Sequence, residues 1–441
     1  MTHTIGMISL GCAKNQVNAE HMLWLLRQAG YEISPDPDGA ELVIVNTCGF
    51  IESAKTEAID NILAMAQLKA EGRIQKILVT GCLAQRYQEE ILQEMPEVDG
   101  VLGTGSYFDV ANAVGQVLSG KRYKRFDDIN ADQSEDGRIL TTPEYYAYLK
   151  IAEGCDNHCA YCIIPKLRGK LRSRPIEELV KEAEQLAADG VKELIVVAQD
   201  TSRYGLDLYG ERKLAELLRQ LCRIDGLVWI RVHYLYPDEM SQELIDVLAN
   251  EPKIVKYLDI PIQHINDDIL RRMNRRGNGE YVKELFAKLR REIPGLVLRT
   301  SLITGLPGEG EAEFEELCDF LREEKIERAG VFPFSPEEGT KAATMEHVPA
   351  EEAQRRTELL IDVQSEIIDA YNDSVLGDIR EVLCEGWSEE SQSFVGRSYA
   401  ESVDIDGKIY FSSNCDIMAG EFVNVRLTGT MDGELTGEAV E

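Results

Sequence analysis

The sequence has few of the features that mark secreted or membrane proteins. Its ten cysteines are spread over 441 residues, which is too sparse for a disulfide scaffold. No run approaches the roughly 18 apolar residues that a membrane-spanning helix needs. The opening stretch, MTHTIGMISL, has no basic segment followed by a long apolar one, so we see no secretory signal. We therefore expect a cytoplasmic protein in which clustered cysteines are metal ligands or redox groups.

Positive charge is also scarce. The chain has 78 acidic and 47 basic residues, and its formal net charge is -31. A field of this sign repels the phosphates of nucleic acids and attracts basic partners, most strongly at low salt. Solubility alone would also explain an acidic surface, so the charge becomes informative only beside other features. The length suits about three domains.

Within the first hundred residues, a short apolar and β-branched run occurs three times, and each run ends in a cysteine. TIGMISLGC ends in Cys12, ELVIVNTC in Cys48 and KILVTGC in Cys82. Such runs are typical of strands buried on both faces of a parallel sheet, and helical patterns lie between them. A fourth strand is predicted at VDGVLGTG. We predict a doubly wound α/β domain over residues 1–125, with the three cysteines at the carboxyl ends of strands, where such sheets bind ligands.

A second alternation of strands and helices follows a polar stretch, residues 126–140, that we interpret as a linker. Residues 141–372 contain six predicted strands, at YYAYLKIAEG, KELIVVAQD, LVWIRVHYL, IVKYLDIPI, LVLRTSLITG and ERAGVFPFS. Six β/α units indicate a partial or full α/β barrel with its site at the carboxyl ends of the strands. Residues 373–441 change to short alternating segments with glycine-rich turns, which predict a small antiparallel β-barrel.

Cys155, Cys159 and Cys162 follow the first strand of the predicted barrel at the spacing C-x3-C-x2-C. A 4Fe-4S cluster normally takes four protein thiolates, so three leave one iron open. An open coordination position is typical of a catalytic metal site. Zinc bound by these cysteines and His158 is the alternative, although His158 is adjacent to Cys159 and the two would have difficulty reaching one ion.

This motif, with Tyr161 before its last cysteine, resembles the signature of the radical S-adenosylmethionine enzymes. The resemblance implies that the amino and carboxylate groups of S-adenosylmethionine chelate the open iron. It implies that electron transfer from the cluster cleaves the sulfonium and yields a 5′-deoxyadenosyl radical. It also implies a partial barrel whose strand ends line the nucleotide pocket, here Gln199, Asp200, Arg231, His233, Gln263, Arg299, Ser301, Gly305 and Gly308. The polar residues among these could instead be structural residues of the barrel rim, and the two glycines could form a simple strand-to-helix turn.

The three N-terminal cysteines, followed by the radical motif, a barrel and a small β domain, make the whole chain similar to the methylthiotransferases of this superfamily. The resemblance implies a second 4Fe-4S cluster on Cys12, Cys48 and Cys82, again with one iron free. It implies that S-adenosylmethionine serves both as methyl donor to sulfur and as radical source. One cluster would generate the radical that removes hydrogen from an unactivated C–H bond, and the other would present sulfur to the carbon. The alternative is that these three cysteines are small buried hydrophobic residues.

Five basic residues lie directly after the radical motif, in KLRGKLRSRP at residues 166–175. They form either a solvated basic loop or a site for a carboxylate of the nucleotide or substrate, because arginine binds carboxylates in a bidentate manner.

Two branches of the methylthiotransferase family differ in substrate. One modifies an adenosine in transfer RNA, and the other modifies the β-carbon of an aspartate in the twelfth small-subunit ribosomal protein. The terminal β domain resembles the TRAM domain, which is commonly an RNA binder, and a basic face is expected of an RNA-binding module. Residues 373–441 instead contain 15 acidic and 4 basic residues.

We therefore predict the ribosomal-protein branch. Its partner would be a basic protein of the small subunit, either free or within the assembled subunit, and we do not expect the terminal domain to bind RNA directly. The resemblance further implies an electron donor such as a flavodoxin system. A non-catalytic iron-sulfur or zinc protein remains the alternative outside this family.

Overall fold

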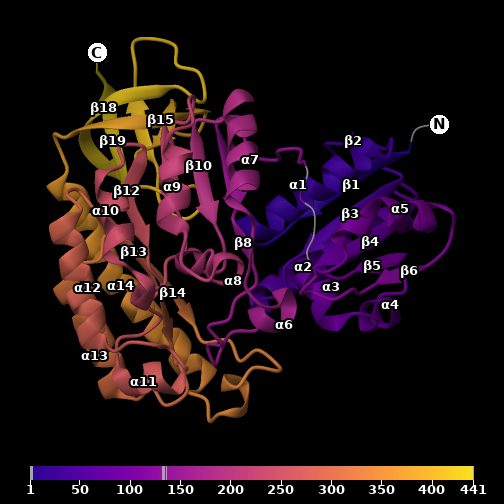
Figure 1. Cartoon of the computed structure of the whole chain (residues 1–441), viewed down its shortest axis with the longest axis horizontal. Coiled ribbons are helices and arrows are strands. Elements are labelled where there is room, and N and C mark those ends of the chain that lie inside the picture. Colours follow the sequence, from indigo (N-terminus) through magenta and orange to yellow (C-terminus); the bar gives the residue numbers. More distant parts are fainter. Residues whose placement is uncertain (1–2, 132–134, 136, 441) are drawn as a thin grey trace.

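The computed structural model describes residues 3–131, 135 and 137–440, and in it the chain forms three bodies (Figure 1). An N-terminal layer, coloured indigo to purple, stands beside a larger central body, and a yellow barrel lies at one end of that body. The predicted linker, residues 126–140, includes residues 132–134 and 136, which lie outside the described residues. Within the described part of the chain, no helix combines the length and apolar character needed to cross a membrane.

The N-terminal layer is a six-stranded parallel sheet in the order β2-β1-β3-β4-β5-β6. Its strands are β1 (Thr4–Ser9), β2 (Glu32–Ser34), β3 (Leu42–Thr47), β4 (Lys76–Gly81), β5 (Gly100–Leu102) and β6 (Tyr123–Arg125). One face is covered by α1 (Ala13–Gln28) and α5 (Val110–Leu118). The other face is covered by α2 (Glu52–Ala70), α3 (Cys82–Tyr87) and α4 (Glu90–Glu94). The predicted doubly wound layer is confirmed, but the sequence did not reveal β2 and β6, because three-residue edge strands lack a long apolar run.

The strand order of this layer reverses beside β1, with β2 on one side and β3 on the other. The crevice at the carboxyl ends of β1 and β3 is therefore a topological switch point, the place where open α/β sheets bind ligands. Cys12 follows β1, Cys48 follows β3 and Cys82 follows β4. Gly11 and Gly81 precede two of these cysteines with φ of +89° and +92°, a conformation that strains any residue with a side chain.

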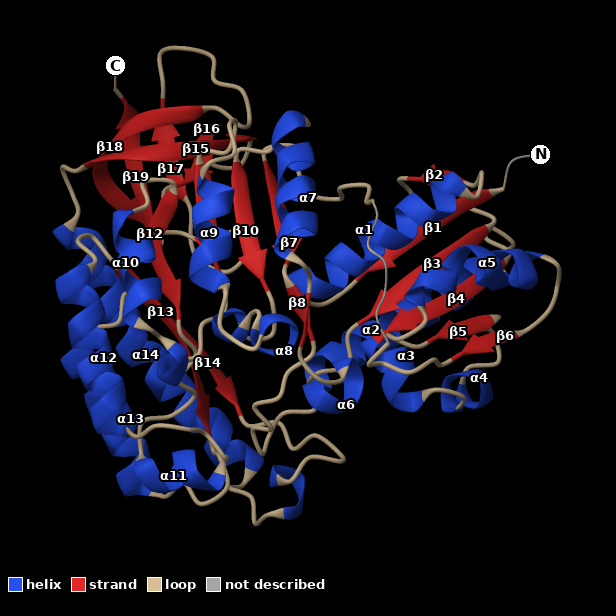
Figure 2. Cartoon of the chain, in the orientation of Figure 1, coloured by secondary structure: helices blue, strands red, loops and turns tan. Residues whose placement is uncertain are grey.

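The central body is an open sheet of six parallel strands in the order β14-β13-β12-β11-β10-β7. The strands are β7 (Tyr146–Lys150), β10 (Glu193–Val197), β11 (Trp229–Val232), β12 (Ile254–Asp259), β13 (Val297–Thr304) and β14 (Arg328–Pro333). The longer helices are α7 (Ile176–Ala188), α9 (Leu214–Cys222), α10 (Gln242–Asn250), α12 (Gly279–Glu292), α13 (Glu311–Glu324) and α14 (Ala350–Ser374). Figure 2 shows these helices outside the curved sheet. The six predicted strands are confirmed, and they form a partial barrel because β7 and β14 are edge strands.

Shorter elements lie in the loops of the central body. They are β8 (Ala152–Glu153), β9 (Arg172–Ser173), α6 (Ile164–Arg168), α8 (Leu206–Tyr209) and α11 (Asp267–Arg272). The radical motif follows β8 and runs into α6, so it lies at the carboxyl edge of the sheet.

The terminal domain is a closed barrel in the order β15-β16-β17-β19-β18. Its strands are β15 (Ile379–Ser388), β16 (Ser393–Arg397), β17 (Ile409–Ser412), β18 (Phe422–Met431) and β19 (Glu434–Ala439). The prediction of an antiparallel barrel needs one correction, because β17 and β19 pair in parallel. An odd number of strands cannot alternate in direction all the way round a closed ring, so one neighbouring pair has to run the same way.

The terminal barrel lies at the amino-end side of the central sheet (Figure 1). Buried polar contacts join the two. Glu193, the first residue of β10, accepts hydrogen bonds from Arg231 Nε and Arg397 Nη2, each at 2.8 Å. The hydroxyl of Tyr257 donates to Asp406 Oδ2 at 2.6 Å. Because these groups are shielded from water, the contacts fix the barrel in one orientation on the central body.

Candidate functional site

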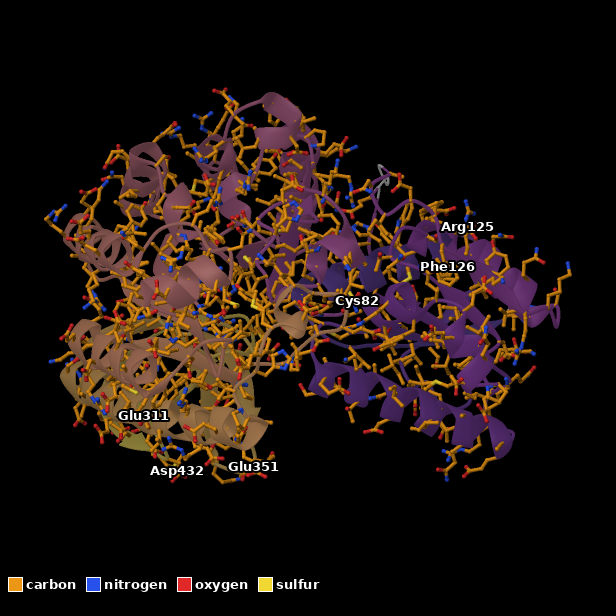
Figure 3. The ribbon with its side chains drawn as sticks, turned by 90° about the horizontal axis from the view of Figure 1, so that it is seen from below. Cys82, Arg125, Phe126, Glu311, Glu351 and Asp432 are labelled. Atoms are coloured by element: carbon orange, nitrogen blue, oxygen red, sulfur yellow. The ribbon has the colours of Figure 1, made fainter. Side chains whose placement is uncertain are left out.

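A cavity of about 370 Å³ lies between the N-terminal layer and the carboxyl ends of the central strands. All six predicted ligand cysteines line it, namely Cys12, Cys48, Cys82, Cys155, Cys159 and Cys162. The other predicted site residues on its wall are Tyr161, Gln199, Asp200, Gln263 and Ser301. Figure 3 shows Cys82 where the N-terminal layer meets the central body. Two motifs that are far apart in the sequence thus face one space.

The guanidinium of Arg168, at the end of α6, reaches from the central body to the N-terminal cysteines. Its Nε and Nη2 donate to the Sγ of Cys82 at 3.3 and 3.2 Å. Nη2 also donates to Asn15 Oδ1 at 2.8 Å, and Nη1 donates to Glu153 Oε2 at 3.3 Å. Arg168 is 3% exposed, so these contacts form in an environment where hydrogen bonds are strong. One residue of the predicted basic loop is therefore not solvated and contacts the N-terminal triad.

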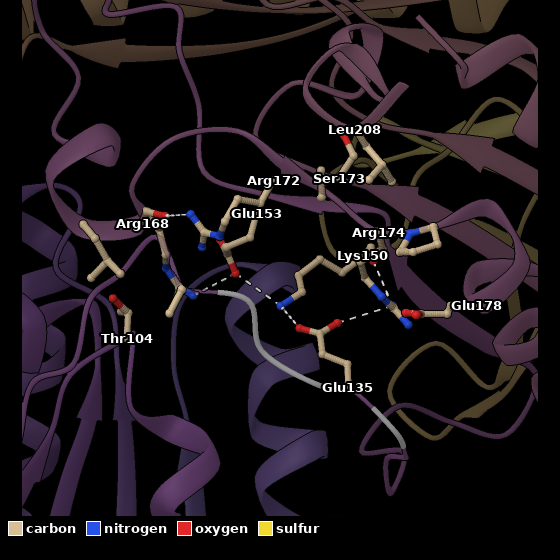
Figure 4. Close-up of a pocket in the computed structure, with 14 residues that line it drawn as sticks. Thr104, Glu135, Lys150, Glu153, Arg168, Arg172, Ser173, Arg174, Glu178 and Leu208 are labelled. Carbon is tan, nitrogen blue, oxygen red and sulfur yellow. Dashed lines mark hydrogen bonds and ion pairs between the residues drawn. The ribbon is translucent and has the colours of Figure 1, made fainter. Parts of the chain in front are cut away.

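A series of ion pairs between alternating acidic and basic side chains leads away from Arg168 along a second cavity of about 400 Å³ (Figure 4). Glu153 Oε2 lies 3.2 Å from Lys150 Nζ, and Lys150 Nζ lies 2.5 Å from Glu135 Oε1. Glu135 Oε2 in turn lies 3.3 Å from Arg174 Nη1. Burial opposes ionisation of Glu153, but Arg168 and Lys150 outweigh it and lower the pKa of this carboxyl to about 2. Glu153 is therefore ionised at neutral pH, and its ion pair with Arg168 leaves that guanidinium little freedom to reorient.

Cys12 differs from the buried cysteines of both triads in the effect of the neighbouring charges on its pKa. Burial raises the pKa of Cys155 to about 11. Burial likewise raises the pKa of Cys162, and the neighbouring Cys159 adds to the effect. Burial also acts to raise the pKa of Cys12, but the cations Lys14 and Arg168 outweigh it, so that pKa is lowered. Burial raises the pKa of Cys48 to about 11 and also raises that of Cys82, although Arg168 opposes the effect at Cys82. The cations therefore favour the thiolate, the form that binds metal, at Cys12 alone.

Arg275, in the loop between α11 and α12, supports the radical motif. Its Nη2 donates to the carbonyl of Pro261 at 2.6 Å, and its Nη1 donates to the hydroxyl of Tyr161 at 3.2 Å. Nη1 also lies 3.9 Å from the Sγ of Cys159. The guanidinium carbon is 4.3 Å from the centre of the Tyr236 ring, a cation–π distance. The aromatic residue of the motif is thus held by an arginine that also contacts a predicted ligand cysteine.

The donor set fits iron-sulfur clusters better than single metal ions. In the part of the chain that the structure describes, no three His, Cys, Asp or Glu side chains are placed to hold one ion. A 4Fe-4S cluster binds each thiolate at a different iron, so its ligands need not converge on a point. The four other cysteines, Cys222, Cys318, Cys384 and Cys415, do not line the cavity. Each triad therefore offers three thiols, which suits a cluster with one iron open to the cavity.

Several predicted pocket residues lie away from this cavity, namely Arg231, His233, Arg299, Gly305 and Gly308. Arg231 lies inside β11 rather than beyond its end, and it donates to the carbonyl of Tyr399 in the terminal domain at 3.0 Å. His233 Nε2 lies 3.2 Å from the Oγ of Ser402. The prediction that both residues line the pocket is wrong. An apolar run in the sequence does not show on which face of the strand a polar residue lies, or how far it is from the strand end. In the structure they contact the terminal barrel.

Arg299 and the two glycines support the cavity wall from outside. Arg299 Nη1 lies 3.0 Å from Asp259 Oδ2 and 3.4 Å from the Oγ of Ser301, which does line the cavity. The amide of Gly305 donates to Glu309 Oε1 at 2.8 Å. Gly308 has a φ of +91° in the same turn. Arg299 lies within β13 and the two glycines form the loop that follows it, and none of the three lines the cavity.

Sequence reasoning missed several residues of the cavity wall. They are Lys14, Phe50, Asn157, Ile164, Tyr234, Leu235, Tyr236, Pro261 and Arg275. Lys14 had a usable signal, because it follows the predicted ligand Cys12 by two positions and lies in the first turn of α1. Arg275 had none, because its loop contains no periodic pattern and only tertiary folding brings it to the radical motif.

Each of the three bodies matches a different family model. Residues 4–103 match the Uncharacterized protein family UPF0004, residues 149–321 match the Radical SAM superfamily, and residues 376–440 match the TRAM domain. A solved structure of the radical S-adenosylmethionine methyltransferase TsrM from Kitasatospora setae, with cobalamin and a [4Fe-4S] cluster bound, has the same fold. Its TM-score is 0.55 at 15% identity, covering 78% of this chain and 77% of that chain. Fold and site together define a radical S-adenosylmethionine protein with a second cysteine triad and a TRAM domain.

Curated relatives narrow this class. The ribosomal protein uS12 methylthiotransferase RimO of Lachnoclostridium phytofermentans is 49% identical over 437 residues, covering 99% of each chain. RimO of Acetivibrio thermocellus is 46% identical and covers 100% of this chain and 99% of its own. The chain belongs to the RimO family of methylthiotransferases.

Proposed function

We propose that the protein transfers a methylthio group to the β-carbon of an aspartate in ribosomal protein uS12, the twelfth protein of the small subunit. The observation that carries the proposal is that two cysteine triads from different domains line one cavity. A reaction that needs a hydrogen-abstracting radical and a sulfur donor at one carbon requires this juxtaposition. The near full-length similarity to RimO proteins supports the same substrate.

Each triad has its own role in this proposal. Cys155, Cys159 and Cys162 would hold the radical-generating 4Fe-4S cluster, and Cys12, Cys48 and Cys82 would hold the auxiliary one. Bound S-adenosylmethionine supplies both the methyl group for sulfur and, on reductive cleavage, the radical that removes hydrogen from the substrate carbon. Gln199, Asp200, Gln263 and Ser301 offer polar atoms along the wall that would orient the nucleotide. The remaining predicted pocket residues would act indirectly, as Arg299 does through Ser301.

The cavity wall also suits the exclusion of water. The same cavity wall includes aromatic and apolar side chains, namely Phe50, Tyr234, Leu235, Tyr236 and Pro261. A radical exposed to solvent or reductant would be quenched before it reached its target, so the protein has to shield and position the reacting atoms.

The charge of the terminal barrel supports a protein substrate over transfer RNA. Two of its four basic residues, Arg380 and Arg397, are buried in contacts within the chain. Its outer surface therefore has even less positive charge than the composition of residues 373–441 indicates. Such a surface repels phosphates and attracts a basic ribosomal protein, so we propose that the barrel does not bind RNA directly.

The reductive step requires a one-electron donor, and we propose a flavodoxin system in that role, as in the enzymes that the sequence resembles. We further propose that the reaction takes place in the cytoplasm, because the proposed substrate belongs to the ribosome. Offering free uS12 and assembled small subunits to the enzyme separately, and measuring the modification of each, will show which of the two is the substrate.

The decisive experiment uses the protein with both clusters reconstituted under anaerobic conditions. S-adenosylmethionine and a reductant are added, small subunits and unmodified transfer RNA are offered in parallel, and methylthio adducts are identified by mass spectrometry. An adduct on a uS12 aspartate is the expected result. An adduct on a transfer RNA adenosine would overturn the choice of substrate, and failure to cleave S-adenosylmethionine would favour a non-catalytic protein.

Cysteine substitutions test whether the two proposed clusters have separate roles. Cys155→Ala should abolish reductive cleavage of S-adenosylmethionine, as should the same change at Cys159 or Cys162. Cys12→Ala, Cys48→Ala and Cys82→Ala should spare cleavage and end sulfur insertion. Loss of both activities on changing the N-terminal triad alone would contradict separate roles for the two clusters.

A further inference from the structure

The loop between β14 and α14, residues 334–349, joins the central body to the N-terminal layer through Glu337. This residue is 2% exposed, and its Oε2 accepts a hydrogen bond from Arg86 Nη1 at 2.6 Å and lies 3.2 Å from Lys55 Nζ. Its Oε1 accepts from the hydroxyl of Ser335 at 2.6 Å. Lys55 belongs to α2 and Arg86 to α3, so one acidic residue of the central body is paired with two cations of the N-terminal layer.

Arg86 connects Glu337 with the N-terminal triad. It lies on α3, the helix that begins at Cys82, and its Nη1 also donates to the carbonyl of Gly49, next to Cys48, at 3.1 Å. The two cysteine segments are in close contact, because a Cβ added at Gly49 would lie 3.0 Å from the carbonyl carbon of Cys82. The ion pair with Glu337 therefore bears on the segments that contain two of the three predicted ligands.

The other end of the same loop contacts the radical motif. The amide of Ala342 donates to the carbonyl of Ala160, inside that motif, at 2.8 Å, and both alanines are buried in one apolar cluster. The carbonyl of Glu337 accepts from the amide of Thr340 at 3.0 Å and from its Oγ1 at 2.7 Å. The stretch from Glu337 to Ala342 is thus held in a compact turn, which links the N-terminal triad to the radical motif.

We propose that Glu337 fixes the separation of the two iron-sulfur clusters, acting through Arg86 as a positioning residue. The proposal rests on the function proposed above, in which a radical and a sulfur atom have to reach the same substrate carbon. Misplacement of reacting groups by about 1 Å can reduce a rate about 100-fold. One contact would leave the N-terminal layer free to pivot, but Arg168, which donates to Cys82 from α6, supplies a second.

A buried ion pair can also serve stability alone, and the two roles differ in which reaction they affect. Reductive cleavage of S-adenosylmethionine to the radical needs only the radical cluster, whereas transfer of the methylthio group needs both clusters at the right distance. Loss of a merely stabilising contact would lower both activities through loss of folded protein. Loss of a positioning contact would lower transfer and leave cleavage intact, so the ratio of the two products separates the roles.

The experiment compares Glu337→Gln with the wild type as full-length proteins with both clusters reconstituted. The amount of methylthiolated uS12 per S-adenosylmethionine cleaved should fall about 10- to 100-fold, while the rate of cleavage stays unchanged. Without substrate, pulsed electron paramagnetic resonance on the reduced protein reports the distance between the clusters through their dipolar coupling. The distribution of that distance should broaden in the variant. Glu338→Gln, at the exposed neighbouring position, is the matched control and should change neither measurement.

The partner residue provides a second test. Arg86→Met should reproduce the lower product ratio and the broader distance distribution. The double variant should be no worse than either single variant, because removing one partner already breaks the contact. Effects of the two changes that simply multiply would show that Glu337 and Arg86 act independently, and would overturn the proposed route through Arg86.

Several other results would overturn the proposal. Equal loss of cleavage and transfer in Glu337→Gln would show a role in stability alone, and an unchanged distance distribution would show that the clusters are positioned by other contacts. Loss of iron from the N-terminal triad would assign Glu337 to cluster binding. If Glu337→Gln does not fold, the wild type still decides, because a broad distance distribution there would refute a fixed separation. Failure of the wild type to modify uS12 despite a narrow distribution would refute the proposed function instead.

Discussion

Replacing Glu193 with glutamine tests how firmly the terminal barrel is fixed to the central body. The change keeps the size of the side chain but removes the negative charge that Arg231 and Arg397 share. Glu193 is fully buried; burial opposes its ionisation, but Arg397 and then Arg231 outweigh it and lower the pKa from 4.5 to about 2. A shift of that size corresponds to about 3 kcal/mol of stabilisation at neutral pH. Removing one partner of a buried ion pair costs about 3–5 kcal/mol in general, which agrees.

The pH dependence follows from the sign of this shift. Because the folded-state pKa is the lower one, the stabilisation is complete above the unfolded value of 4.5 and is lost as the pH falls toward 2. Glu193→Gln should therefore have its full effect at neutral pH. The difference between the variant and the wild type should shrink below about pH 4.5.

Native-state hydrogen exchange is the suitable assay, because it reports opening of one part of a protein separately from global unfolding. Amides of β15 to β19 should exchange about 100-fold faster in Glu193→Gln than in the wild type at neutral pH. Glu438→Gln, on an exposed position of β19, is the matched control and should change nothing. Exchange within about threefold of wild type, which is below 1 kcal/mol, would refute the reasoning that this carboxylate anchors the barrel.

Two further predictions concern the N-terminal triad. Arg168→Met should shift the reduction potential of the auxiliary cluster to a more negative value, because hydrogen bonds to cluster sulfur ligands raise it. A redox titration on a Cys155→Ala background isolates that cluster, and an unchanged potential would contradict the role of Arg168. Gly11→Ala should lower the iron bound by the N-terminal triad, because the added Cβ would lie 2.7 Å from the Cβ of Cys48. Gly39→Ala, with a similar φ of +86° but open space, should leave the iron content unchanged, and equal loss would point to backbone strain alone.

Cations from two domains lie beside the N-terminal triad. The N-terminal cysteines lie between Lys14, from their own domain, and Arg168, from the central body. The auxiliary site is therefore completed by a residue that follows the radical motif in the sequence. An isolated N-terminal domain would lack Arg168, so its cluster would have a different environment from that in the whole chain.

Much of the fold follows from local sequence patterns. Apolar β-branched runs mark β1, β3 and β4 and the six strands of the central sheet, because strands buried on both faces need continuous apolar surface. The spacing of Cys155, Cys159 and Cys162 indicates a cluster with an open iron, because ligand type and number are local properties. Such patterns do not reveal short edge strands such as β2, nor the parallel pairing of β17 with β19. Both depend on the position and direction of the neighbouring strands.

The sequence by itself determined the architecture and the class of chemistry, and it predicts the six ligand cysteines. The tertiary structure decided that both triads share one cavity and that Arg231 and His233 face the terminal barrel. It also decided that Lys14 and Arg275 belong to the cavity wall. The physical reason is that hydrophobic periodicity and ligand spacing act over a few residues. A buried charge is instead positioned by partners that come from distant segments, and those partners meet only when the domains pack together.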